Sequence, residues 1–159
     1  SDYVEYSFLF AREAVDELKA KYPHRDIKIK LFYNDFGCYT KDKRNAICAL
    51  AQSIMDFGNE RGKGDLIDGV GMQCYLGGPN NTFFDKNEKV LQPSENGAVD
   101  SIPNAVFKFH ELGLDVQFTE LTVHNYDESK NAAQAAYYEK VMQMVIDINN
   151  GTMQPLLED

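Results

Sequence analysis

The feature of this sequence that most constrains its fold is a regular alternation of helical and strand patterns. Apolar residues recur every three or four positions over residues 2–21, 41–61, 101–113 and 128–150, as is typical of amphipathic helices. Three short apolar segments lie between them, over residues 27–35, 65–76 and 114–121, and are typical of buried strands. Because long helical crossovers join parallel strands, we expect a parallel α/β sheet.

Residues typical of helix ends agree with this interpretation. Thr40 is a predicted N-cap of the second helix, and a glycine follows the second, third and fourth helices (Gly62, Gly113 and Gly151). The fourth helix is expected to turn five side chains inward: Ala132, Ala136, Val141, Val145 and Ile148. Glycines 69 and 71 would let a neighbouring layer approach the second strand closely. The polar stretch 77–100 is expected to be a long functional or mobile loop.

A parallel sheet has two common solutions, the open doubly wound sheet and the closed eight-stranded barrel. Three strands make a poor open sheet, because both edges would stay unpaired. The sequence also runs out soon after a helix, with no strand to follow. We therefore expect a partial (β/α)8 TIM barrel, with three parallel strands alternating with four helices.

Composition excludes several classes of function. The net charge of -9, from 16 basic and 25 acidic residues, argues against nucleic acid as a partner. No apolar run reaches the ~20 residues that a membrane helix needs, and the first residues lack the features of a signal peptide. Cys38, Cys48 and Cys74 have no metal-ligand spacing and are expected to be buried thiols. No metal or cofactor is predicted.

All three predicted strands end in polar side chains, at the ends that face the active site in parallel α/β folds. They are Asn34 and Asp35, then Gln73 and Tyr75, and finally Glu120. Each one alone has a structural explanation, such as a turn cap, a bond to a neighbouring backbone or a solvated rim position. An amide, a phenol and a carboxylate gathered at one edge of a sheet together favour a functional site.

The segments FAREA, LFYNDFG, IDGVGMQCYL and FHELGLDVQFTEL, with their spacing, resemble the family 10 glycoside hydrolases, the endo-xylanases. The resemblance runs from the helix after the family's fourth strand to the helix after its seventh. It implies that residues 1–159 are the C-terminal part of a barrel catalytic domain, without the first four strands and the last. It also implies xylan, a β-1,4-linked polysaccharide, as the substrate, retention of configuration, and an extracellular location for the longer enzyme.

The resemblance assigns roles residue by residue. Glu120 matches the nucleophile, Asn34 and Asp35 match the pair that ends the fifth strand, and Gln73 matches a glutamine near the nucleophile. A retaining glycosidase needs a second carboxyl group ~5–5.5 Å from the nucleophile as its acid/base. The family places that residue at the end of its fourth strand, so the chain alone is expected to be inactive.

The sequence departs from the family at positions that matter to the chemistry. Tyr75 stands where the family usually has histidine, and Thr122 where it has aspartate. A hydrogen bond between these two could aim the phenolic proton at Glu120. The pair indicates either a re-tuned active site or a degenerate copy that no longer cleaves.

Two further positions are candidates for sugar contacts. Phe36 replaces a common tyrosine on the loop after the first strand, with Gly37 in place of a common asparagine. His124 lies just past the third strand, where it meets either a sugar or solvent.

Three hypotheses stay open: part of a retaining hydrolase, a non-catalytic carbohydrate-binding or interaction domain on the same scaffold, and a small α/β domain whose likeness is incidental. The outer edges of the first and third strands predict a homodimer or higher oligomer through unpaired strands.

Overall fold

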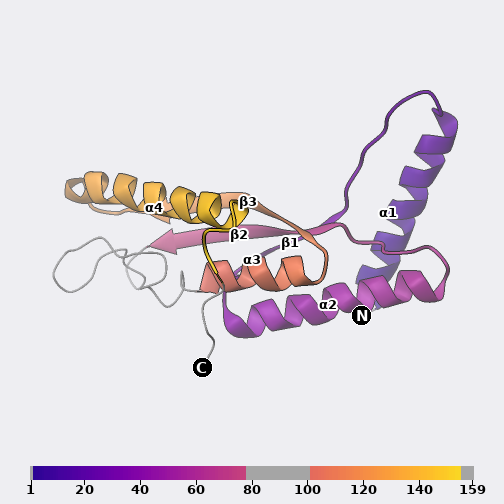
Figure 1. Cartoon of the computed structure of the whole chain (residues 1–159), viewed down its shortest axis with the longest axis horizontal. Coiled ribbons are helices and arrows are strands. Elements are labelled where there is room, and N and C mark those ends of the chain that lie inside the picture. Colours follow the sequence, from indigo (N-terminus) through magenta and orange to yellow (C-terminus); the bar gives the residue numbers. More distant parts are fainter. Residues whose placement is uncertain (1, 78–100, 155–159) are drawn as a thin grey trace.

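The structure is a computed structural model that describes residues 2–77 and 101–154 (Figure 1). Its elements follow in the order α1 (Asp2–Lys21), β1 (Phe32–Phe36), α2 (Lys41–Glu60), β2 (Gly69–Gly77), α3 (Ser101–Glu111), β3 (Asp115–His124), the 3-10 turn η2 (Glu128–Lys130) and α4 (Asn131–Asn149). The loop expected over residues 77–100 lies outside the described residues, apart from Gly77.

The three described strands form one parallel sheet in the order β1, β2, β3. Phe32 begins β1 opposite Gly69, which begins β2 and lies opposite Asp115 of β3. The register between β2 and β3 shifts by one residue after Met72, so that Gln73 lies opposite Glu120. Within the described ranges, three parallel strands thus alternate with four helices, as the sequence predicts.

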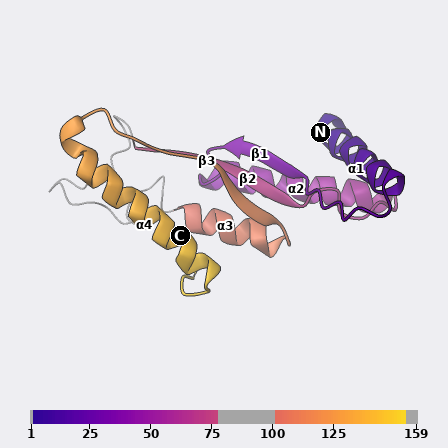
Figure 2. The ribbon, with the colours of Figure 1, turned by 90° about the horizontal axis from the view of Figure 1, so that it is seen from above.

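One face of the sheet is the core of the molecule. Val70, Met72, Cys74 and Leu76, at alternate positions of β2, are fully buried on this face. Side chains of three helices pack on it: Ile47, Ala51 and Ile54 from α2, Ile102, Ala105 and Phe109 from α3, and Tyr137, Val141 and Met144 from α4. Figure 2 shows α3 and α4 next to β3, with which both are in contact. On the opposite face Asn34, Phe36, Tyr75 and Glu120 are exposed.

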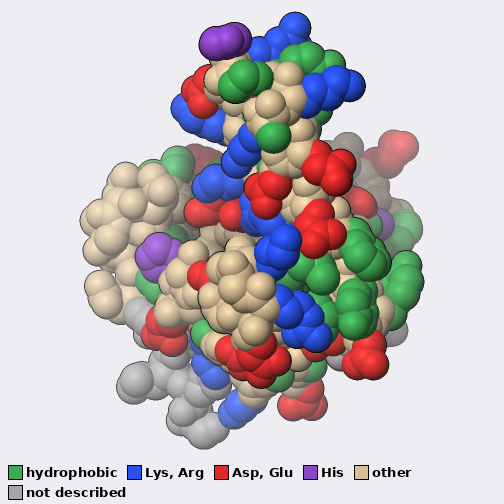
Figure 3. Space-filling view, turned by 90° about the vertical axis from the view of Figure 1, so that its right-hand side faces the viewer, with side chains coloured by type: hydrophobic (Ala, Val, Ile, Leu, Met, Phe, Trp, Pro, Cys, Tyr) green, Lys and Arg blue, Asp and Glu red, His purple; other side chains and the backbone are tan. Residues whose placement is uncertain are grey.

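The first helix packs against α2, to which it is steeply inclined (Figure 1). Arg12 of α1 donates a hydrogen bond to the Asp68 carboxylate at 2.6 Å and another to the Leu66 carbonyl at 3.0 Å. Asp68 also accepts from the Leu31 N–H at 2.6 Å. This carboxylate fixes α1 to the segments that lead into β1 and β2. On the side of the molecule that carries α1, basic and acidic side chains are interspersed (Figure 3).

Strand bounds differ from those predicted because pairing, and not apolar content alone, decides where a strand begins. β1 starts at Phe32 instead of residue 27, since its described partner β2 starts opposite it at Gly69. β2 itself starts four residues later than predicted. β3 continues to His124, three residues beyond the prediction, because β2 extends to Gly77 and pairs with it.

Helix bounds agree closely with the predictions, and Thr40 is the N-cap residue of α2 as predicted, but the inward position expected for Ala132 is wrong. The Thr40 hydroxyl donates to the Gly37 carbonyl at 3.0 Å and makes no side-chain cap for α2. The last helical segment begins as a 3-10 turn, in which the Asp127 carboxylate accepts from the Ser129 N–H. In α4, Ala132 is exposed, whereas Tyr137, Val141 and Met144 form the buried face. The larger apolar side chains thus set the helix rotation.

The three cysteines are free thiols: Cys38 and Cys74 are buried and Cys48 is half-buried. Burial raises the pKa of Cys74 to about 12 and that of Cys38 to about 11.

Among residues 2–77 and 101–154, no three His, Cys, Asp or Glu side chains are grouped so that they could hold a metal ion. None of the described helices combines the length and apolar character needed to span a bilayer.

Candidate active site

The open face of the sheet, opposite the core, gathers most of the residues singled out from the sequence. Neighbours in the register share a face, so Asn34 lies beside Gly71 and Phe36 beside Gln73. Gln73 in turn lies beside Glu120, and Tyr75 lies beside Thr122. His124 pairs with Gly77 at the end of the same face. Parallel strand ends therefore bring Asn34, Phe36, Gln73, Tyr75, Glu120, Thr122 and His124 to one surface.

The contact between Tyr75 and Glu120 is the central feature of this surface. The Tyr75 hydroxyl donates a hydrogen bond to Glu120 Oε2, across the boundary between β2 and β3. This bond to a carboxylate raises the pKa of the Tyr75 phenol above its ordinary value, so the phenol stays protonated and remains a donor. Tyr75 is 40% exposed, which leaves the pair accessible from solvent. The phenol is directed at Glu120, as expected, but it bonds the carboxylate directly and makes no hydrogen bond to Thr122.

A bulge in β3 turns Glu120 toward this face. Val116, Phe118, Leu121 and Val123 pack on the core side, whereas the consecutive residues Thr119 and Glu120 are both exposed. Thr119 Oγ1 donates to Asn34 Oδ1 at 2.7 Å, which links β3 to β1 over the top of β2. This link was not predicted from the sequence. Its one signal was Gly71, a glycine inside a strand pattern.

Asp35 does not join the cluster. As the neighbour of Asn34 along β1 it points to the other side, where it accepts from the Tyr33 hydroxyl at 2.9 Å and from Lys43 Nζ at 2.8 Å. Its other oxygen accepts from the Phe36 N–H at 2.8 Å. Burial opposes ionisation of Asp35, but these hydrogen bonds hold its pKa below the usual value. Burial and the bond to Asp35 raise the pKa of Tyr33 to about 12. Asp35 thus braces the turn into α2.

Aromatic rings line the far end of the open face. The His124 ring lies between Tyr75, at a centroid distance of 6.5 Å, and Tyr126, at 6.0 Å with an interplanar angle of 1°. Tyr126 is 77% exposed and was not singled out from the sequence, because it lies beyond the predicted strand. On β1, Phe36 is 62% exposed, with Lys43 Nζ 4.8 Å from its ring centroid. Exposed rings of this kind suit the apolar faces of a ligand.

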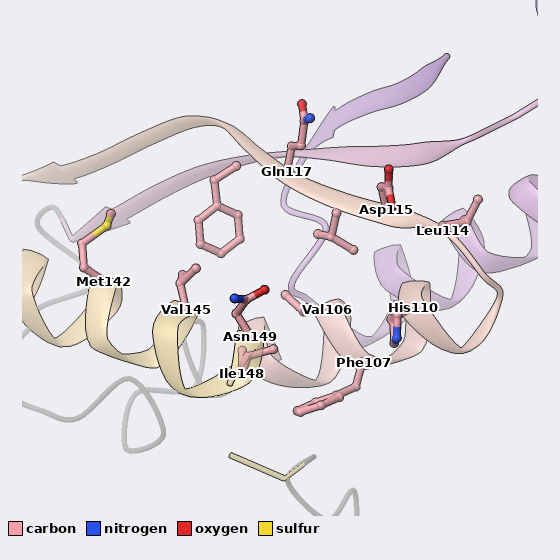
Figure 4. A pocket seen from close by; sticks show the side chains of 12 residues that line it. Val106, Phe107, His110, Leu114, Asp115, Gln117, Met142, Val145, Ile148 and Asn149 are labelled. Atoms are coloured by element: carbon pink, nitrogen blue, oxygen red, sulfur yellow. The ribbon is translucent and has the colours of Figure 1, made fainter. Parts of the chain in front are cut away.

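A hollow of about 680 Å³ lies elsewhere, between α3, β3 and α4 (Figure 4). Its lining is mainly apolar, including Val106, Phe118, Val145 and Ile148, and contains none of the open-face cluster. The side chains of Asp115 and Gln117 point away from the hollow, on the far side of β3. The hollow belongs to the helix-facing layer, so the Glu120 cluster is the better candidate for an active site.

Comparison with known proteins bears on this surface. The family model described as "Glycosyl hydrolase family 10" matches residues 1–154, almost the whole chain. Among curated relatives, endo-1,4-beta-xylanase A of Thermotoga neapolitana is 32% identical over 136 residues, which are 84% of this chain and 10% of that protein. Endo-1,4-beta-xylanase Y of Acetivibrio thermocellus is 27% identical over 148 residues, or 92% and 11%.

Solved structures agree with the family model. The N-terminal endo-1,4-beta-D-xylanase 10B of Clostridium thermocellum, determined in complex with xylohexaose, superposes with a TM-score of 0.63 at 26% identity over 94% of this chain and 24% of that one. An endo-1,4-beta-xylanase from Caldicellulosiruptor owensensis gives 0.58 at 25% identity over 90% and 37%. This likeness confirms the partial (β/α)8 barrel. The chain spans between 10% and 41% of the length of the curated relatives it matches.

Proposed function

Because the chain belongs to glycosyl hydrolase family 10, we propose that its open face is part of the active site of a retaining endo-1,4-β-xylanase, with xylan as substrate and Glu120 as nucleophile. The observation that carries this proposal is the position of Glu120 in the second half of β3, exposed and held by the Tyr75 phenol. The two-carboxylate mechanism itself calls for no metal or cofactor.

The chemistry assigns Glu120 a defined step. Its carboxylate attacks the anomeric carbon and forms a glycosyl–enzyme ester while the glycosidic oxygen leaves with a proton from an acid. Water then cleaves the ester, and retention of configuration results from the two successive inversions. The hydrogen bond from Tyr75 restricts the carboxylate to one orientation.

The other open-face residues would contact the sugar or support the nucleophile. Asn34 and Gln73 offer amide groups for sugar hydroxyls, and Thr122 and His124 extend the polar surface along β3. Phe36 offers an exposed ring at the end of β1. Asp35 supports them indirectly, through the turn that it braces.

Residues 1–159 by themselves should be inert. By resemblance the acid/base ends the fourth strand of the barrel, and general acid catalysis contributes ~10²–10⁴ in rate. In the described sheet β1 and β3 each have one edge without a partner strand, so we also expect the chain alone to associate as a dimer or higher oligomer.

The test compares two proteins, the 159-residue chain and a complete barrel that includes it. Release of reducing sugar from xylan is expected from the barrel only. Light scattering of the chain at micromolar concentration should give more than a monomeric mass. Turnover by the chain alone would contradict the expectation that it lacks the acid/base. A monomeric mass would contradict the expected association. Recovery of the barrel from culture medium or from cells would decide its location, which we expect to be extracellular.

A non-catalytic carbohydrate-binding role is the second candidate. It is favoured by Tyr75 and Thr122 in place of ionisable family residues, and by the stacked rings of Tyr75, His124 and Tyr126. A complete barrel that binds xylo-oligosaccharide in calorimetry, yet releases no sugar from xylan, would establish it.

A further inference from the structure

We propose that a side-chain bridge from Asn34 to Thr119, passing over Gly71, fixes the bulge in β3 and so aims Glu120 at the open face. Thr119 and Gly71 are then positioning residues. Their importance for catalysis rests on the proposed role of Glu120, whereas the bridge itself rests on geometry alone.

The register shows what the bulge does. Gly71 lies opposite Gln117 and Met72 opposite Phe118, but Gln73 lies opposite Glu120, so Thr119 is an extra residue in β3. In an uninterrupted ladder Gln73 would pair with Thr119, and Glu120 would pair with Cys74. Cys74 is fully buried on the core face. A shift of one residue moves a side chain to the other face of a sheet, so without the bulge Glu120 would point into the core.

The bridge explains how this irregular backbone is held. Thr119 has no partner on β2, and its hydroxyl reaches Asn34 Oδ1 at 2.7 Å on the far strand of the sheet. Two strand spacings, roughly 9–10 Å, separate β1 from β3, so the two side chains must meet directly above β2. The hydrogen bond ties Thr119, the extra residue of β3, to a regular position of β1, because Asn34 pairs in normal register with Gly71.

Glycine at position 71 leaves the space that the bridge occupies. A Cβ atom there would lie 2.7 Å from Asn34 Oδ1 and 2.9 Å from Thr119 Cγ2, both closer than side-chain carbons are found. Any larger residue would therefore displace one end of the bridge. The glycine in the strand and the hydrogen bond above it are parts of one arrangement.

The hydrogen bond from Tyr75 to Glu120 reports on this arrangement without any need for catalysis. It requires Glu120 on the open face, and it raises the pKa of the Tyr75 phenol. If the bulge shifts, the carboxylate moves away from the phenol, and the phenol should titrate closer to an ordinary tyrosine. This readout would not move if Thr119 merely stabilised the sheet.

The experiment uses Thr119→Val, which removes the hydroxyl at nearly constant shape, and Thr119→Ser, which keeps it. Both are made in the complete barrel that includes this chain, with the tyrosine ring carbons labelled for NMR titration. Thr119→Val should lower the Tyr75 pKa and reduce kcat on xylan by ~10–100-fold with KM little changed, as expected for a misplaced reactive group. Thr119→Ser should restore both. Gly71→Ala should resemble Thr119→Val if it folds; if it does not, the Val and Ser pair decides.

The outcomes distinguish the proposed bridge from the proposed function as a xylanase. A Tyr75 titration that is the same in wild type and Thr119→Val would overturn the bridge as a positioning device. A changed titration in a barrel that never hydrolyses xylan would support the bridge and refute the proposed function. A loss of kcat in Thr119→Val that Thr119→Ser fails to restore would contradict the part assigned to the hydroxyl.

Discussion

The two faces of β2 differ in how they hold their side chains. On the core face Val70, Met72, Cys74 and Leu76 are fully buried among helix side chains, so packing fixes them. On the open face Tyr75 keeps 40% of its surface exposed, and a hydrogen bond to Glu120 fixes it. We therefore propose that adjacent residues of one strand serve stability and chemistry separately. Substitutions on the two faces should have different consequences.

The largest effect is expected on the open face, at the residue proposed to react. Glu120→Gln in the complete barrel should reduce xylan hydrolysis by at least ~10⁴-fold, because an amide cannot form the glycosyl–enzyme ester. Its urea midpoint should stay close to wild type, since glutamine has nearly the shape and volume of glutamate. Glu128→Gln, just beyond β3, is the matched control and should keep full activity. Near-normal hydrolysis by Glu120→Gln would show that another residue is the nucleophile.

Next comes the core face, one residue away from Tyr75. Leu76→Ala removes a fully buried side chain and should lower the free energy of unfolding by ~2–5 kcal/mol, through lost burial and the cavity left behind. Urea denaturation measures this change. The folded fraction should retain its kcat. A stability change below about 1 kcal/mol would mean that this face is less tightly packed than the structure indicates.

The helix and strand pattern was predictable from the sequence because it depends on local periodicity. The gathering of Gln73, Tyr75 and Glu120 was predictable too, since parallel strands end on the same side. The bulge was not, because Thr119 and Glu120 are simply two consecutive polar residues until the register with β2 is known. The start of β1 depended likewise on its partner, and Tyr126 lay beyond any strand pattern.

An intermediate effect is expected from Tyr75→Phe, which leaves the ring but removes the hydrogen bond to Glu120. One bond to a charged group contributes ~1.5–3 kcal/mol, so activity of the complete barrel should fall by roughly 10–100-fold. Comparison with Leu76→Ala tests the difference between the open face and the core face of β2, because Tyr75→Phe should change the free energy of unfolding little. Unchanged kcat in Tyr75→Phe would favour the view that Tyr75 has lost any part in catalysis.

The smallest effect should come from Asp35, which lies beside Met72 on the core side of the sheet but is held by hydrogen bonds. Hydrogen bonds hold its pKa below the usual value, so its ionised form stabilises the fold above the unfolded-state pKa, and this contribution is lost as pH falls through the lower, folded-state pKa. Asp35→Asn should cost about 1 kcal/mol at neutral pH and flatten the decline in stability below pH ~4. Urea midpoints at several pH values measure this. An acid dependence identical to wild type would exclude Asp35 as its source.

The central claim is that Glu120 on the open face forms a covalent bond to the sugar. A 2-deoxy-2-fluoro xylobioside with a dinitrophenolate leaving group tests it most directly, because this leaving group needs no proton and the fluorine slows hydrolysis of the ester. Peptide mass spectrometry of the treated complete barrel should locate the sugar on Glu120, and Glu120→Gln should remain unlabelled. Label on any other residue, or none in a barrel that hydrolyses xylan, would contradict the account.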